Sequence, residues 1–238
     1  MYGGRKAACP LDIVIIGCGL GGLAAAYCLG QAGHRVTLLE AAPALGEVGA
    51  GIQVSPNVSR LLIRWGLKEQ LEKIAVRPEG ISFRRCTSSF LSPTHSTFSD
   101  SLASERIGQD GKTVGYTTWE GMEGEYGAPY YQIHRADFHK LLFDLALPVM
   151  TLRLNSQVTG IDVYSESPSC TLATGEVIKA DFIIGADGVK SHTRELIVGG
   201  PDKPRPTGDA AYRAIIPIEG LLADPELRSA ADVLNAEV

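Results

Sequence analysis

The apolar positions between residues 12 and 40 change from an unbroken run to a helical pattern and back. The β-branched run Ile13–Ile16 is typical of a strand buried on both faces of a parallel sheet. An alanine-rich segment from Leu23 to about Gln31 predicts a helix that ends at Gly33. Residues 35–39 predict a second strand, which runs directly into Glu40. The pattern therefore predicts a strand, a turn, a helix and a second strand of an α/β fold.

Shorter elements are predicted along the rest of the chain. Strands are expected at 81–85, 130–133, twice within 151–163, at 180–185 and at 210–217, with a hairpin across 169–182. Helices are expected at 58–65, at 190–197, from 224, and from 134 with Phe138, Leu141, Leu142 and Leu145 on the apolar face. Ser55 and Pro56 suit the N-cap and first position of the helix that follows them. From Cys86 to about Asp110 the chain is rich in Ser and Thr without a period, which predicts a long surface excursion or a disordered segment.

Three glycines between the first strand and the first helix form the pattern G-x-G-x-x-G, at Gly17, Gly19 and Gly22. In dinucleotide-binding proteins the first glycine permits a tight turn, the second lets the backbone approach a pyrophosphate, and the third packs the helix against the strand. The helix N-terminus points its free N–H groups at the phosphates, and an acid placed like Glu40 accepts from ribose hydroxyls. A glycine-rich turn without a ligand is the alternative. The combination predicts an adenine-dinucleotide site and leaves open whether FAD or NAD fills it.

Residues 180–188 show a similar arrangement in the second half of the chain: an apolar strand again ends in glycines and precedes a short helix. Asp187 stands at the carboxyl end of that strand, which is where doubly wound sheets bind ligands. A helix N-cap is a second role for Asp187, and it is compatible with the first.

The composition excludes several classes of protein. A chain of 238 residues is long enough for one large domain or one and a half. Its net charge of −5 gives no basic surface for nucleic acid. Its five cysteines show no C-x-x-C spacing, so we expect a reduced, intracellular, cytoplasmic protein without disulfides or a metal site. Residues 1–12 lack the apolar core of a signal peptide, and the apolar stretch 13–29 is broken by glycines, so no membrane span is predicted.

Taken together, these segments resemble the FAD-dependent aromatic hydroxylases, the class A flavin monooxygenases that include salicylate and para-hydroxybenzoate hydroxylases. The resemblance rests on the glycine turn and Glu40, on His134-Arg135-Ala136-Asp137, and on Gly-Ala-Asp-Gly-Val-Lys-Ser at 185–191, in this order. Residues 49–57 also resemble the salicylate-hydroxylase branch, and the resemblance covers most of the chain from Leu11 to about Pro217. It implies an α/β fold: a Rossmann-like FAD-binding domain with a parallel sheet at 1–80 and 130–200, and an incomplete β-rich substrate domain at 81–129 and 201–238.

The resemblance also implies which residues hold FAD: Gly17, Gly19, Gly22, Glu40, Gly49, Gly51, Gln53, Arg135, Asp187 and Gly188. The first three would cradle the pyrophosphate and Glu40 the adenosine ribose, while residues 49–53 would lie along the ribityl and flavin side or form a mobile loop. Arg135 would reach the pyrophosphate or ribityl region, or be a solvated arginine at a helix start. Asp187 and Gly188 would serve the FAD ribose and the passing NAD(P)H.

Tyr212-Arg213 matches a pair that, in phenol-hydroxylating fungal relatives, puts the arginine against the substrate phenolate. A phenol reacts best as phenolate, and a buried cation lowers its pKa, so Arg213 is the predicted catalytic residue. An edge-strand arginine facing solvent is the alternative. The implied activity is hydroxylation of an aromatic or phenolic small molecule with FAD, oxygen and NAD(P)H as co-substrate, in secondary metabolism or aromatic catabolism.

Three features depart from the family pattern. The chain stops at Val238, before the family's second flavin motif; residues 86–110 look inserted; and the link from Ala146 to Leu154 looks short. These departures suggest a truncated product of a mistranslated or decayed gene model, or of alternative splicing. A catalytically inactive FAD-binding fragment is therefore one alternative. An NAD-dependent dehydrogenase is the second, although it leaves residues 185–190 and Arg135 unexplained.

Overall fold

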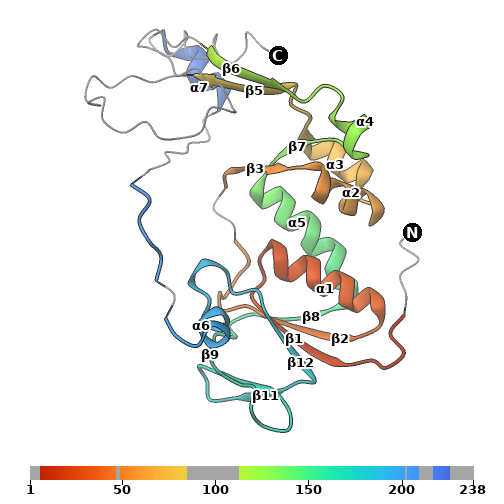
Figure 1. Cartoon of the computed structure of the whole chain (residues 1–238), viewed down its shortest axis with the longest axis vertical. Helices are drawn as coiled ribbons and strands as arrows, with labels where there is room; N and C mark the ends of the chain where they lie inside the picture. The colour runs from red at the N-terminus through yellow and green to blue at the C-terminus, as the bar shows by residue number, and fades with distance from the viewer. Residues whose placement is uncertain (1–5, 47–48, 85–112, 202, 209–216, 226–238) are drawn as a thin grey trace. The chain divides into compact units, whose positions relative to one another are not determined.

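The structure is a computed structural model that describes residues 6–46, 49–84, 113–201, 203–208 and 217–225 (Figure 1). The chain divides into two compact units. One comprises Gly3–Gly51 and His134–Val238, and is called the nucleotide unit below; the other comprises Ile52–Ile133 with Met1–Tyr2.

A four-stranded parallel sheet forms the centre of the nucleotide unit, in the order β12 (Phe182–Gly185), β1 (Asp12–Ile16), β2 (Arg35–Leu39) and β8 (Thr151–Arg153). Ile13 pairs with Phe182 on one side of β1 and with Val36 on the other. Because β1 lies between two partners and is covered on both faces, its apolar run is buried, as an unbroken β-branched sequence predicts.

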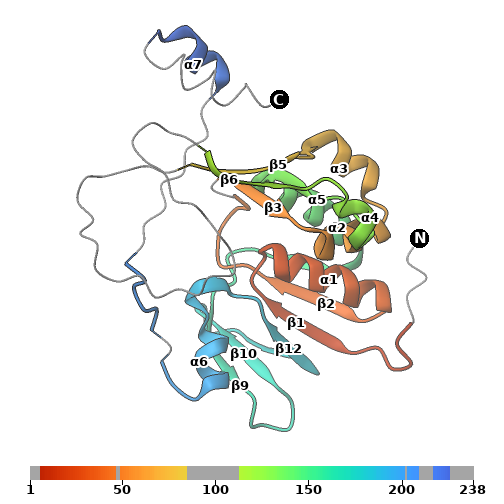
Figure 2. The ribbon, with the colours of Figure 1, turned by 45° about the horizontal axis from the view of Figure 1, so that its top comes forward.

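Different layers cover the two faces of this sheet. Helix α1 (Leu20–Ala32) packs on β1 and β2, and α5 (Arg135–Ala146) packs on α1 (Figure 1). On the other face, Val14, Ile16 and Leu39 form a core with Cys170, Leu172 and Ala180. The latter group belongs to the antiparallel sheet of β9 (Val158–Asp162), β10 (Ser169–Leu172) and β11 (Val177–Lys179) and to the residue after it (Figure 2). Side chains alternate along a strand, so Ile13 and Ile15 face the helices.

The second unit combines short strands and helices around Leu62, Leu71 and Tyr131, which are buried. A three-stranded sheet has the order β3 (Gly51–Val54), β7 (Tyr131–His134) and β4 (Ala75–Val76), and β5 (Gly80–Arg84) pairs with β6 (Thr113–Thr118). Its helices are α2 (Pro56–Arg64), α3 (Lys68–Ile74) and α4 (Met122–Tyr126). Among the described residues, the remaining elements are η1 (Leu147–Val149), η2 (Gly188–Lys190), α6 (His192–Val198) and α7 (Ile218–Ala223).

The structure confirms the predicted α/β fold class with its parallel sheet, and most predicted elements agree within a few residues. Helix α1 ends at Gly33, whose φ is +99°, but it begins at Leu20 rather than Leu23 because the Leu23 N–H already donates to the Gly19 carbonyl at 3.0 Å. Ser55 occupies the N-cap of α2, yet its hydroxyl bonds the Asn57 side chain instead of a helix N–H. The hairpin predicted across 169–182 turns at Gly175 but ends with β11.

The segments predicted at 86–110 and 210–216 and the tail after 225 lie outside the described residues. None of the helices in the described ranges combines the length and apolar character needed to cross a bilayer.

Candidate functional site

The segments that follow β1, β2 and β12 meet at one edge of the parallel sheet. Between them lies a cavity of about 500 Å³, called the sheet-edge cavity below. This volume lies within the range of ordinary small-molecule sites, roughly 300–1,000 Å³. Its lining is formed by Ile16, Gly17, Cys18, Gly19, Leu39, Glu40, Ala41, Ser156, Gln157, Val158, Ile161, Ala186, Asp187, Gly188, Lys190 and His192. The structure thus brings together five of the predicted site residues, from three separate segments.

The three glycines of the turn differ in what requires them. Gly17 has a φ of +106°, and a Cβ there would lie 2.4 Å from the Ala186 carbonyl oxygen. A Cβ on Gly22 would lie 2.0 Å from the Gly17 carbonyl oxygen. A Cβ on Gly19, by contrast, would meet nothing within 4 Å, and its φ of −80° suits any residue. The packing of the chain accounts for glycine at 17 and 22, whereas the space beside Gly19 is open.

The N-terminus of α1 follows Gly19 directly. The first N–H groups of a helix have no partner within it, and the helix dipole adds a partial positive charge at this end. Gly19 has no side chain to cap them, and the first turn of α1 holds no acidic residue. The end of this 13-residue helix therefore suits an anion such as a pyrophosphate.

Glu40 is held in place by its neighbours' backbone. Its Oε2 accepts from the Cys18 N–H at 2.9 Å, and its Oε1 accepts from the Ala42 N–H at 2.9 Å. A carboxylate has about four acceptor sites, so two remain for hydroxyl donors. Glu40 therefore joins the turn after β1 to the segment after β2 and still presents acceptors to the cavity.

Asp187 is bound to the start of α6. Its Oδ1 accepts from the Ser191 hydroxyl, and its Oδ2 accepts from the Thr193 N–H at 3.0 Å and the Thr193 hydroxyl at 3.1 Å. Partial burial raises the pKa of Asp187, but the hydrogen bonds from Ser191 and Thr193 outweigh it and hold the pKa below its ordinary value. The N-cap of α6 is Ser191, which accepts from the Arg194 N–H. The helix-capping role expected of Asp187 is thus shared: Ser191 caps the helix, and Asp187 supports Ser191.

Cys18 lies within the turn but is not a reactive thiol. It is 2 % exposed, and burial, followed by the negative charge of Glu40, raises its pKa to about 11. The thiol is therefore protonated at neutral pH and packs as a small apolar residue.

The other predicted site residues lie outside the lining of the sheet-edge cavity. Gly49 packs against His134, since a Cβ there would lie 2.3 Å from the imidazole Nε2, so the chain itself accounts for this glycine. Arg135 is an exposed residue at the start of α5, where its N–H donates to the Ala50 carbonyl. Gln53 belongs to the second unit, and Arg213 lies outside the described residues.

Several lining residues were missed by sequence reasoning. Ser156 and Gln157 follow β8, which ends at the same edge of the sheet, so the rule that placed Asp187 would also have found them. Lys190 was used only as part of the motif at 185–191 and as the start of a predicted helix, and His192 only as part of that helix, so neither was predicted as a site residue. His139 does not line this cavity, yet it is buried in α5 and bonds the Cys18 carbonyl. No sequence pattern predicts the contact between His139 and the Cys18 carbonyl.

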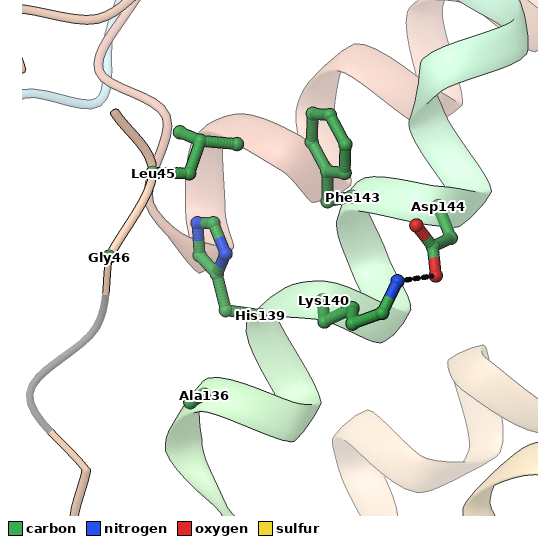
Figure 3. Close-up of a pocket in the computed structure, with 7 residues that line it drawn as sticks. All are labelled: Leu45, Gly46, Ala136, His139, Lys140, Phe143 and Asp144. Carbon is green, nitrogen blue, oxygen red and sulfur yellow. Dashed lines mark hydrogen bonds and ion pairs between the residues drawn. The ribbon is translucent and has the colours of Figure 1, made fainter. Parts of the chain in front are cut away.

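A second hollow of about 360 Å³ lies beside α5 and is lined by Leu45, Gly46, Ala136, His139, Lys140, Phe143 and Asp144 (Figure 3). Its two charged groups satisfy each other, because Lys140 Nζ lies 2.7 Å from Asp144 Oδ2. The rest of its lining is apolar except for His139, whose ring points from α5 towards Leu45 (Figure 3).

Comparison with known proteins decides between the two dinucleotides. The family described as FAD binding domain matches residues 10–200. The chain belongs to this FAD-binding family. The match confirms the resemblance to FAD-dependent aromatic hydroxylases and identifies FAD as the cofactor of the family.

Relatives of the FAD-binding family show the same relationship. The chain is 38 % identical over 223 residues to FAD-dependent monooxygenase OpS4 of Beauveria bassiana, covering 92 % of this chain and 47 % of the relative. It is 35 % identical to 6-hydroxynicotinate 3-monooxygenase of Bordetella bronchiseptica, covering 86 % and 48 %. Among solved structures, CtdE in complex with FAD and a substrate superposes with a TM-score of 0.66 at 25 % identity, covering 83 % and 42 %. The chain thus spans about half the length of these relatives.

The residues present fit FAD at the sheet-edge cavity. The open side of Gly19 and the uncapped end of α1 suit a pyrophosphate, and Glu40 retains acceptors for ribose hydroxyls. Lys190 adds one cation to a lining that also holds the carboxylates of Glu40 and Asp187.

Proposed function

We propose that this chain carries the FAD-binding part of a monooxygenase that uses NAD(P)H and oxygen to hydroxylate an aromatic or phenolic small molecule. The observation that carries the proposal is the sheet-edge cavity, where Gly19 leaves open space beside the N-terminus of α1 and Glu40 faces the same space. When bound, FAD supplies the redox chemistry of such an enzyme, taking reducing equivalents from NAD(P)H and activating oxygen.

The residues of the chain have binding and orienting roles in this proposal. The Gly19 N–H and the first turn of α1 hold the pyrophosphate, and Glu40 accepts from the adenosine ribose. Asp187 and Gly188 contribute the opposite wall, with the Asp187 carboxylate kept ionised by the hydrogen bonds that lower its pKa. The roles of Gly49, Gly51, Gln53 and Arg135 along the cofactor, and of Arg213 against a substrate phenolate, remain predictions from the resemblance. So does the division into FAD-binding and substrate-domain segments.

The first test is whether the purified chain retains flavin. After incubation with saturating FAD and removal of free flavin by dialysis, the protein should be yellow with a perturbed flavin absorption spectrum, and a colourless protein would refute the proposal. The second test follows NAD(P)H oxidation and product formation with 3-hydroxybenzoate and 6-hydroxynicotinate as probes, because relatives are named for hydroxylating them.

A flavin-binding chain without monooxygenase activity is the second candidate function. It is favoured by one observation, namely that the chain spans 47 % to 50 % of the length of relatives with this activity. Bound flavin without NAD(P)H oxidation, under conditions in which a full-length relative turns over, would decide for it.

A further inference from the structure

His139 is the only polar residue among the buried residues of α5, and it is 7 % exposed. Burying an imidazole without a hydrogen-bond partner is unfavourable, and the partner here is a backbone group. His139 Nε2 lies 2.7 Å from the carbonyl oxygen of Cys18, in the middle of the glycine turn. A carbonyl oxygen only accepts, so the Nε2–H donates and this nitrogen carries the proton.

The bond from His139 fixes the orientation of the peptide group between Cys18 and Gly19. In a trans peptide the C=O and the following N–H point in opposite directions. Because the Cys18 C=O is directed at α5, the Gly19 N–H is directed away from α5. Cys18 and Gly19 line the sheet-edge cavity, whereas His139 is absent from its lining and lines the hollow beside α5 shown in Figure 3. The turn therefore separates His139 from the cavity.

The N–H of Cys18 is held as well, by Glu40 Oε2 at 2.9 Å. Two side chains from distant segments, Glu40 and His139, thus fix consecutive peptide groups of a turn whose glycines would otherwise allow many conformations. We propose that His139 is a positioning residue that sets the Cys18–Gly19 peptide so that the Gly19 N–H faces the FAD pyrophosphate. This inference rests on the proposed function, because it assigns the anion that the N–H meets.

Three substitutions separate hydrogen bonding from packing. His139→Gln places an amide N–H near the position of Nε2. His139→Asn places its amide N–H near the position of Nδ1, and this shorter side chain does not reach the Cys18 carbonyl. His139→Leu fills the space without a donor. The dissociation constant for FAD, measured by quenching of flavin fluorescence, should rise about fivefold to tenfold for Asn and Leu, the loss of one hydrogen bond. It should stay within about twofold of the parent for Gln.

A second readout needs no ligand. The Cys18 amide should exchange with solvent deuterium faster in His139→Asn and His139→Leu than in the parent and His139→Gln, because the turn loses one of its two anchors. Gln and Asn bury the same amide group, so their comparison stands even if His139→Leu fails to fold.

Each result decides the question. Equal FAD affinity in the parent, Asn and Leu variants, whatever the change in Tm, would reduce His139 to a packing residue, and so would a Gln variant that behaves like Leu. If the parent itself binds no FAD, the proposed function fails; the exchange experiment then decides whether His139 orders the turn, and unchanged exchange would overturn the inference.

Discussion

Replacing Gly19 by alanine should separate ligand binding from folding more cleanly than any other change in the turn. The added methyl group meets no protein atom within 4 Å, and the backbone at Gly19 is in a region that alanine adopts. The methyl group would instead occupy the space beside the N-terminus of α1, where the pyrophosphate is proposed to lie. Gly21→Ala is a matched control in the first turn of α1: it keeps the backbone N–H, a Cβ there also meets nothing within 4 Å, and Gly21 does not line the cavity.

The effect on stability can be worked out from two opposing contributions. Alanine is a poorer N-cap than glycine, which costs roughly 0.5–1.5 kcal/mol. Removing a glycine also restricts the unfolded chain, which stabilises the fold by about 0.4–1 kcal/mol. The net change is within about 1 kcal/mol, or about 2–4 °C in Tm for a chain of this size. Displacing a phosphate from even one N–H removes a charge-assisted hydrogen bond of about 1.5–3 kcal/mol, so FAD affinity should fall tenfold to hundredfold.

Titration of flavin fluorescence and thermal unfolding of the ligand-free protein measure the two effects separately. Gly19→Ala should bind FAD at least about tenfold more weakly with nearly unchanged Tm, whereas Gly21→Ala should bind as the parent does. Parent-like affinity in Gly19→Ala would show that the open space beside Gly19 is not where the pyrophosphate lies. A large loss of Tm would show instead that the residue is required by the fold.

Four further outcomes are expected. Gly22→Ala should lower Tm in the absence of any ligand, because its Cβ would lie 2.0 Å from the carbonyl oxygen of Gly17; an unchanged Tm in thermal unfolding would contradict that packing. Glu40→Gln should weaken FAD binding about tenfold in the same titration, since it removes the charge from an acceptor of ribose hydroxyls. At pH 8 a thiol with a pKa of about 11 is only ~0.1 % ionised, so iodoacetamide should modify the exposed Cys9 and spare Cys18, as peptide mass spectrometry will show. Because the pKa of Asp187 is lowered in the fold, its carboxylate stabilises the protein at pH values above 3.8, the ordinary pKa, and this contribution is lost as the pH falls below that value. Asp187→Asn should therefore reduce Tm at pH 7 and flatten the decline of Tm below about pH 4.

The part of the site that could be predicted is the part built from local sequence. The β-branched run before Gly17, the three glycines and the acid at 40 lie within about thirty residues, and each has a local physical reason. The position of Asp187 also followed from a local rule, because a ligand site lies at the carboxyl ends of parallel strands. The structure places these segments together around one cavity, as that rule requires.

What could not be predicted depends on contacts between distant residues. His139 looks like a polar interruption of an apolar helix face, and its partner is a backbone carbonyl 121 residues away. The close approach of Gly49 to the His134 imidazole is a contact across 85 residues that the glycine content alone did not indicate, and the predicted role of Gly49 along the cofactor stays a prediction. The sequence also gave no sign that the Glu40 carboxylate would be shared with two backbone N–H groups. Backbone partners carry no residue-type signature, so patterns of side chains do not reveal them.

The pairing of β1 with β12 has a consequence for synthesis on the ribosome. The Asp12 N–H donates to the Asp181 carboxylate, 169 residues later, and Gly17 packs on Ala186. At about 5–20 residues per second, β1 waits roughly 8–34 s for this neighbour. Residues 52–133 of the second unit are all synthesised during that interval. Throughout it, β1 presents an apolar strand edge on which chaperones or other nascent chains can act. If residues 186–188 form a wall of the FAD site, as proposed above, FAD can bind only to chains whose translation has passed residue 188, and flavin content then reports that the sheet is complete.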